Sequence, residues 1–204
     1  GPVDAFFDGV ITHQTFFCLG EAADDVVGHE FTHGVVFASS RLWFADQSGA
    51  LNEAYADVMG NLIAPDQTTG EWQVGELRTG GVIRDMKNPG IGHISGFLPR
   101  NATCNLLPWS CDSGNVHANA GIINRAHVML SDGIPDGSGG FLSRGIGRVK
   151  MARLMHLTMT QRLFSDARLN DAAVAERDIC EMLVSRGVLD IAGNAYTIDD
   201  CDQI

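Results

Sequence analysis

The sequence has few basic residues, no closely spaced cysteine pairs and no long apolar run. Its 204 residues carry 14 lysines and arginines against 25 aspartates and glutamates, a net charge of −11. This balance, with no basic patch, argues against nucleic acid or an anionic membrane as a partner. No apolar run approaches the roughly 20 residues of a membrane span, so no membrane association is expected. The absence of a Cys-x-x-Cys pair makes a structural zinc knuckle an unfavoured interpretation.

What is present is typical of a soluble globular protein. Hydrophobic residues make up 45% of the chain and charged residues 19%. The length suffices for a sizeable core, and we expect a single, monomeric domain over residues 1–204.

Apolar periodicity and turn signals predict a mainly α-helical chain with a small N-terminal β ribbon. Residues 1–20 form the predicted ribbon, with a turn at Asp8-Gly9, and residues 64–114 look irregular. Little other sheet is expected. Two helices are predicted within 22–63, the second N-capped by Ser48, and a helical subdomain is predicted over 115–204. The predicted helices span about 22–39, 49–63, 116–131, 146–164, 169–186 and 197–203.

Five cysteines allow two disulfides. Cys104 and Cys111 flank a short loop, and Cys180 and Cys201 lie near the C-terminal end, whereas Cys18 is left over. Two disulfides in an exported protein is the favoured interpretation, and buried free thiols are the alternative.

Residues 29–33 read His-Glu-Phe-Thr-His. Positions four apart share one face of a helix, so His29 and His33 can both reach one Zn²⁺, while Glu30 beside them suits a base. Two surface histidines on an amphipathic helix are the alternative. The surrounding helix is so apolar that we expect it to be buried nearly all round. Buried histidines and a glutamate need partners, and a metal supplies them.

A catalytic zinc needs a third protein ligand. Glu53 and Asp57 lie four residues apart on the next predicted helix, which is otherwise largely apolar. Glu53 can complete the ligand set, and Asp57 can accept the N–H of a ligand histidine. An exposed acidic face is the alternative, and the apolar neighbours disfavour it.

Together these motifs resemble the thermolysin family of gluzincin zinc metalloendopeptidases. His29-Glu30-x-x-His33 is followed by Glu53 in Asn52-Glu53-x-x-x-Asp57, and residues 114–124 are similar to the family's second histidine motif. Residues 82–86 resemble its substrate-arginine segment, and residues 4–7 resemble its edge strand. The resemblance covers nearly the whole chain and implies a thermolysin-like helical catalytic lobe.

The resemblance also implies a role for each matching residue. Glu30 would activate a zinc-bound water for hydrolysis of a peptide bond, and His117, held by Asp112, would donate to the oxyanion. Arg84 would bind a substrate carbonyl, for which a surface salt bridge is the alternative. The substrate backbone would pair with Ala5, and an apolar pocket would accept a bulky hydrophobic residue after the cut bond. The predicted lining of that pocket is Val26, Val74 and Ile83.

The sequence departs from the family at three places. Phe44 stands where the family usually has a tyrosine that helps to bind the oxyanion. The family's Ca²⁺ ligands are only partly kept, at Asp25, Glu71 and Glu76, so a calcium site is a weaker prediction than zinc. The family's larger N-terminal β-rich lobe is almost absent, either trimmed or naturally missing.

The family resemblance further implies secretion and synthesis with a pro-segment. Two alternatives to an endopeptidase stay open. One is an aminopeptidase of related type, for which no amine-anchoring motif is found. The other is a weakly active or inactive zinc-binding module for protein interaction.

Overall fold

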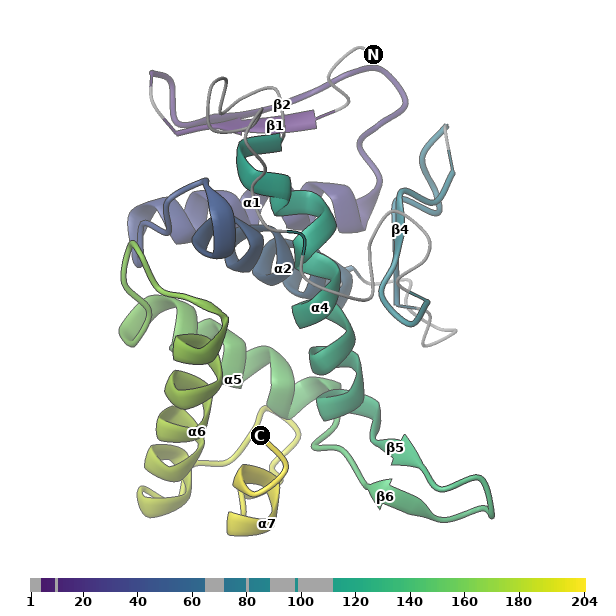
Figure 1. Cartoon of the computed structure of the whole chain (residues 1–204), viewed down its shortest axis with the longest axis vertical. Helices are drawn as coiled ribbons and strands as arrows, with labels where there is room; N and C mark the ends of the chain where they lie inside the picture. Colours follow the sequence, from purple (N-terminus) through teal and green to yellow (C-terminus); the bar gives the residue numbers. More distant parts are fainter. Residues whose placement is uncertain (1–4, 10, 65–71, 80, 89–97, 99–111) are drawn as a thin grey trace.

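The computed structural model describes residues 5–9, 11–64, 72–79, 81–88, 98 and 112–204. Helices dominate it (Figure 1), which confirms the predicted mainly α fold. Helix α1 (Asp24–Ala38) packs on α2 (Asp46–Ile63), and α4 (Asp112–Asp132) packs on the same α2. Helix α2 is therefore the centre of the molecule and is buried along most of its length.

Two glycines set how closely α1 and α2 approach. A Cβ on Gly28 would lie 2.9 Å from Gly60 Cα, and a Cβ on Gly60 would lie 2.4 Å from the Asp25 carbonyl oxygen. Larger side chains at either position would push the helices apart. This close crossing brings the His29 face of α1 against the Glu53 face of α2.

Strands β1 (Ala5–Asp8) and β2 (Gln14–Phe17) form the predicted antiparallel ribbon, with Ala5 opposite Phe17. The turn is closed by Asp8, whose carboxylate accepts the backbone N–H groups of Ile11 at 3.1 Å and Thr12 at 2.8 Å. The ribbon lies at the top of the molecule in Figure 1, and Phe7 packs against Phe37 of α1. Ala5 is thereby held beside α1.

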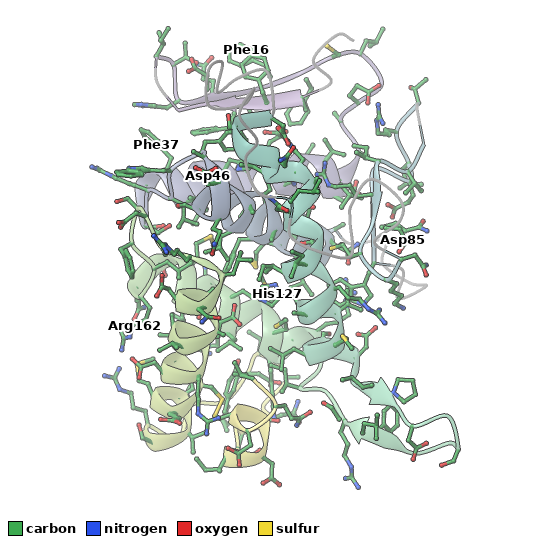
Figure 2. All side chains as sticks on the ribbon, in the orientation of Figure 1. Phe16, Phe37, Asp46, Asp85, His127 and Arg162 are labelled. Carbon is green, nitrogen blue, oxygen red and sulfur yellow. A yellow bond between two sulfur atoms is a disulfide. The ribbon has the colours of Figure 1, made fainter. Side chains whose placement is uncertain are left out.

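Helices α5 (Arg148–Gln161), α6 (Leu169–Ser185) and α7 (Ile198–Cys201) complete the body below α2. A disulfide joins Cys180 of α6 to Cys201 of α7, as predicted. Cys104 and Cys111 lie outside the described residues, and Cys18 is exposed. Figure 2 shows the side chains of the described residues on the ribbon. Across the whole molecule, the largest apolar side chains that are fully buried are Leu51, Tyr55, Trp72, Met86, Met151, Leu154, Met155, Met159, Ile179 and Leu183.

Two expectations about local structure were wrong. Helix α1 is not buried all round, because Phe31 is 63% exposed and Val27 is also exposed on the face away from α2. Ser48 is not an N-cap: α2 begins at Asp46, and the Ser48 hydroxyl instead donates to the Ser165 carbonyl at 2.7 Å.

Little further sheet is present in the described residues, as expected. Two further short antiparallel pairs join β3 (Gln73–Val74) to β4 (Arg84–Asp85) and β5 (Ile134–Pro135) to β6 (Phe141–Ser143). The first pair falls in the region predicted to be irregular, and it brings Arg84 towards α2. Among the residues described, no helix has the length and apolar character needed to cross a membrane.

Candidate active site

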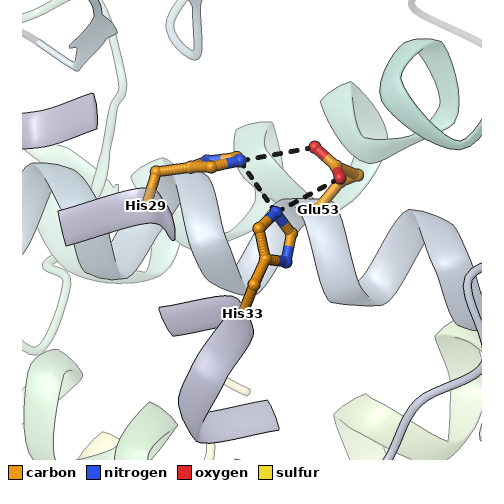
Figure 3. Close-up of side chains that lie close together, drawn as sticks. All are labelled: His29, His33 and Glu53. Carbon is orange, nitrogen blue, oxygen red and sulfur yellow. Dashed lines mark hydrogen bonds and ion pairs between the residues drawn. The ribbon is translucent and has the colours of Figure 1, made fainter. Parts of the chain in front are cut away.

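Three potential metal ligands converge where α1 crosses α2 (Figure 3). The Nε2 atoms of His29 and His33 lie 3.0 Å apart. Glu53 places Oε1 3.4 Å from Nε2 of His33 and Oε2 3.6 Å from Nε2 of His29. In the described parts of the chain, no other group of three histidine, cysteine or acidic side chains brings its ligand atoms as close together.

These donor atoms fit one zinc ion. Donors about 2.0–2.1 Å from a tetrahedral Zn²⁺ lie about 3.4 Å from each other. The separations here are 3.0 Å between the two Nε2 atoms, 3.4 Å from His33 Nε2 to Glu53 Oε1 and 3.6 Å from His29 Nε2 to Glu53 Oε2. Glu53 Oε2 is buried and accepts no hydrogen bond from the described residues. A cation would offset the cost of that buried charge. Burial lowers the pKa of His33 to about 4, so its imidazole is neutral at pH 7, the form that binds metal.

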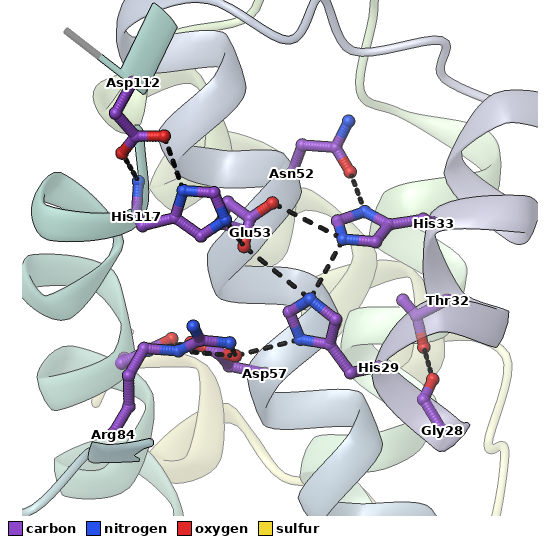
Figure 4. Close-up of polar contacts among 11 residues, drawn as sticks. Gly28, His29, Thr32, His33, Asn52, Glu53, Asp57, Arg84, Asp112 and His117 are labelled. Atoms are coloured by element: carbon purple, nitrogen blue, oxygen red, sulfur yellow. Dashed lines mark hydrogen bonds and ion pairs between the residues drawn. The ribbon is translucent and has the colours of Figure 1, made fainter. Parts of the chain in front are cut away.

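Helix α2 also holds the second ring nitrogen of each histidine (Figure 4). His29 Nδ1 lies 2.9 Å from Asp57 Oδ1, and His33 Nδ1 lies 2.8 Å from Asn52 Oδ1. A carboxylate only accepts, so His29 carries its proton on Nδ1 and leaves Nε2 available to a metal. The structure thus places Asp57 where the sequence predicted. Asn52 was missed as a partner, although it directly precedes Glu53.

Asp57 is fully buried and is shared by several elements. Arg84 Nε donates to its Oδ2 at 2.8 Å, and Arg84 Nη2 donates to its Oδ1. Burial opposes ionisation of Asp57, but the charge of Arg84 and the hydrogen bond from His29 outweigh it and hold the pKa far below the usual range. Arg84 is therefore a buried, ion-paired residue rather than part of a surface salt bridge.

Glu30 lies beside the two histidines and lines a cavity of about 190 Å³. Its Oε2 is buried without a hydrogen-bond partner among the described residues. Burial raises the Glu30 pKa, and the nearby positive groups His29 and Arg84 oppose that rise only in part. A carboxyl with a raised pKa suits proton transfer near neutral pH. The other residues around the cavity are Ala5, Glu21, Val26, His29, Val74, Ile83, Arg84 and His117.

That list contains every residue predicted to touch substrate. Glu21 was not predicted. It comes from the segment before α1, and its carboxylate accepts a hydrogen bond from Arg78 Nε. Neither residue belongs to a motif, and only the fold brings Glu21 to the wall of the cavity.

His117 faces the same site from α4. Its Nδ1 lies 2.6 Å from Asp112 Oδ1, its backbone N–H donates to Asp112 Oδ2 at 2.9 Å, and its Nε2 lies 3.2 Å from Glu53 Oε2. Burial opposes protonation of His117, but Asp112 and Glu53 outweigh it and raise the pKa. The pairing with Asp112 therefore has the predicted geometry.

The backbone before His117 is strained. Asp112, Ser113 and Asn115 all have positive φ, at 49°, 50° and 62°. Gly114 between them (φ 101°) leaves no room for a Cβ, which would lie 2.3 Å from Asp46 Oδ1. Such non-glycine conformations cost free energy and often accompany functional sites. Here they turn the chain so that Asp112 reaches back to His117.

Phe44 stands at the open side of the site. Its ring centroid lies 6.3 Å from that of His33 and 6.0 Å from that of His117, both edge-on. The ring is 47% exposed. The ring lies close to His33 and His117 and carries no hydroxyl, so it offers no hydrogen-bond donor to the site.

Of the three predicted calcium ligands, Asp25 and Glu76 lie within the described residues. Asp25 is buried, and its carboxylate accepts the backbone N–H of Val26 at 2.8 Å and that of Gly75. It therefore ties α1 to the segment that follows β3. Glu71 lies outside the described residues.

Comparison with known proteins agrees with the geometry. The family model for the alpha-helical domain of thermolysin metallopeptidases matches residues 40–195, a range that begins after the His29-Glu30-x-x-His33 motif. A solved structure of a protealysin precursor, a metalloproteinase from Serratia proteamaculans, superposes with a TM-score of 0.63 at 25% identity, covering 87% of this chain and 59% of that one.

Several curated proteins are similar to this chain. A zinc metalloproteinase from Renibacterium salmoninarum is 34% identical over 203 residues, covering 94% of this chain and 35% of that protein. A bacillolysin from Bacillus cereus is 35% identical over 156 residues, covering 71% and 26%. An extracellular elastase from Staphylococcus epidermidis is 30% identical over 192 residues, covering 90% and 33%. The chain spans about a third of the length of these relatives. It belongs to the thermolysin family of metallopeptidases.

Proposed function

We propose that this chain is a zinc-dependent endopeptidase. The observation that carries the proposal is the convergence of His29, His33 and Glu53 on one point, with Glu30 beside them on the wall of a cavity. When bound, Zn²⁺ supplies a Lewis acid that polarises the scissile carbonyl and acidifies water. Everything else in the reaction falls to side chains of this chain.

Glu30 is the proposed general base. It takes a proton from the attacking water and delivers it to the leaving amine nitrogen. Burial raises its pKa, which makes the carboxylate a stronger base for the first transfer. The residue is not needed to hold metal, so its loss should separate chemistry from binding.

His117 and Arg84 act on the developing charge and on the substrate. His117 Nε2 is the proposed donor to the oxyanion, because Asp112 holds its ring in place. Burial lowers the pKa of His117, but the effect of Asp112 in the opposite direction contributes to a net rise. Arg84, anchored on Asp57, lines the cavity and is proposed to donate to a substrate carbonyl. Ala5, on the strand whose partner is β2, is proposed to pair with the extended substrate backbone.

The apolar part of the cavity sets the proposed specificity. Val26, Val74 and Ile83 line it beside Glu30. A hydrophobic side chain placed there after the scissile bond would lose its contact with water. We therefore expect cleavage before leucine or phenylalanine in preference to glycine or aspartate.

Cleavage of a quenched peptide tests this function directly. The wild-type protein should cut a peptide with leucine after the scissile bond, and a chelator should stop it. Glu30→Ala should lose activity by about 10²–10⁴-fold while keeping its zinc. Absence of cleavage by the fully zinc-loaded wild type would instead favour the zinc-binding interaction module, the alternative raised by Phe44.

Two further proposals follow from family membership. A monomer that acts on peptide or protein substrates outside the cell, made with a pro-segment, is consistent with the extracellular elastase among the relatives and with the Cys180–Cys201 disulfide. A calcium ion near Asp25, Glu71 and Glu76 remains a weaker proposal, because Asp25 already accepts two backbone N–H groups.

A further inference from the structure

Asn124 of α4 is a buried polar residue that the roles proposed above leave without a function. Its side chain is fully buried, and its Nδ2 donates to Asp57 Oδ2 at 2.8 Å. Burying an amide in an apolar core is costly unless it is hydrogen-bonded. A leucine of similar size would avoid that cost if the position only filled space.

The bond to Asp57 joins α4 to the zinc site. Asp57 Oδ1 lies 2.9 Å from His29 Nδ1, so the same carboxylate that Asn124 contacts orients a metal ligand. His117 precedes Asn124 by seven residues, two turns of α4, so both project from the same face of the helix. Asn124 thus lies at the point where the helix of the proposed oxyanion donor contacts the carboxylate behind the zinc.

Because Arg84 also binds Asp57, a further donor is needed to keep the Asp57 carboxylate directed at His29. Its Nε and Nη2 together engage both oxygens of the carboxylate, a bidentate arrangement that pulls Asp57 towards β4. His29 offers one N–H in competition with this fork. A donor on Oδ2 from the α4 side fixes the rotation of the carboxylate, so that Oδ1 stays directed at His29 while Arg84 stays bound.

We infer that Asn124 is a positioning residue: through Asp57 it holds His29 in the orientation that binds zinc and ties the helix of His117 to that orientation. Only the expected effect on catalysis rests on the proposed function. The expected effect on zinc binding rests on the contacts of Asp57 with His29 and Asn124.

The test measures zinc affinity by competition with a chromogenic chelator and, separately, kcat and KM for a quenched peptide. Asn124→Ala should weaken zinc binding about 10- to 100-fold, the usual effect of removing an outer partner of a ligand histidine. It should lower kcat more than it raises KM, because the substrate-contacting residues remain.

Asn119 provides the matched control. It is an equally buried asparagine on α4, but its Nδ2 donates to the carbonyls of Leu98 and Gly114 and not to Asp57. Asn119→Ala should lose thermal stability, yet keep zinc affinity within about twofold of the wild type. Equal loss of zinc affinity in both variants would mean that any buried amide on α4 matters, and it would overturn the inference.

A double-mutant cycle separates positioning from bulk structure. In an Asp57→Ala background, Asn124→Ala should change zinc affinity less than twofold, because its route to His29 is gone. If the fold-losses of zinc affinity in the two single variants multiply in the double variant, a route through Asp57 is contradicted. If Asn124→Ala does not fold, Asn124→Leu removes the donor at similar volume, and wild-type zinc affinity in that variant would overturn the inference.

A wild-type protein that binds zinc but cuts no peptide would remove the proposed peptidase function. The comparison of zinc affinities would still decide the role of Asn124.

Discussion

Adding one hydroxyl at Phe44 is expected to increase turnover. Phe44→Tyr keeps the ring between His33 and His117, where the centroids lie 6.3 and 6.0 Å away, and places a donor near the proposed oxyanion. A preorganised oxyanion donor is worth about 10²–10³-fold in kcat. Because the Phe44 ring is 47% exposed, water competes for the new hydroxyl. We therefore expect about a tenfold gain, or about 1.4 kcal/mol of transition-state stabilisation.

The assay is steady-state cleavage of a quenched peptide at full zinc occupancy. The gain should fall on kcat with KM nearly unchanged, since the hydroxyl acts on charge that develops only in the transition state. Phe141→Tyr is the control, because Phe141 is 55% exposed on the β5–β6 hairpin, away from α1 and the site (Figure 1). An unchanged kcat in Phe44→Tyr, or an equal gain in the control, would refute the reasoning.

Three further outcomes are expected. Burial raises the pKa of Glu30 in the folded state. Ionisation of the Glu30 carboxyl therefore opposes folding at pH values above its unfolded-state pKa of about 4.3. For this reason Glu30→Gln should raise the melting temperature of the zinc-free protein at pH 7. That gain should disappear as the pH falls through the folded-state pKa of Glu30 towards 4.3, and a pH-independent gain would contradict the cause given. Replacing Cys180 and Cys201 by alanine should cost about 3 kcal/mol of unfolding free energy for the loop that they close, and an unchanged chemical-denaturation midpoint would refute this. Adding Ca²⁺ to the zinc-loaded protein should raise the melting temperature only if the ion binds near Asp25, and Asp25→Asn should then abolish the rise.

The sequence was sufficient for residues whose partners lie on the same helix or whose spacing carries meaning. His29 and His33 lie one turn apart, and Glu53 and Asp57 lie one turn apart on the next helix, so each pair shares a face whatever the tertiary structure. The resemblance to a family supplied His117 and Arg84, which lie far along the chain. The helices themselves were predicted to within a few residues by apolar periodicity and turn signals.

Residues that act only through tertiary contacts were not predictable. Nothing in the spacing of Asn124 or Glu21 indicates that one reaches Asp57 and the other lines the cavity. The exposure of Phe31 was also hidden, because an apolar helix shows which residues favour burial but not how many neighbours are available to cover them. Ser48 looked like a cap because its alternative partner, the Ser165 carbonyl, comes from a loop more than a hundred residues away.

The central claim is that His29, His33 and Glu53 hold one zinc with which Glu30 cleaves peptides. Metal analysis and peptide cleavage on the same sample test it most directly. We predict one zinc per chain, cleavage before leucine, loss of both on chelation, and recovery of both when zinc is restored. One zinc per chain without any cleavage, or cleavage that survives complete removal of zinc, would contradict the claim.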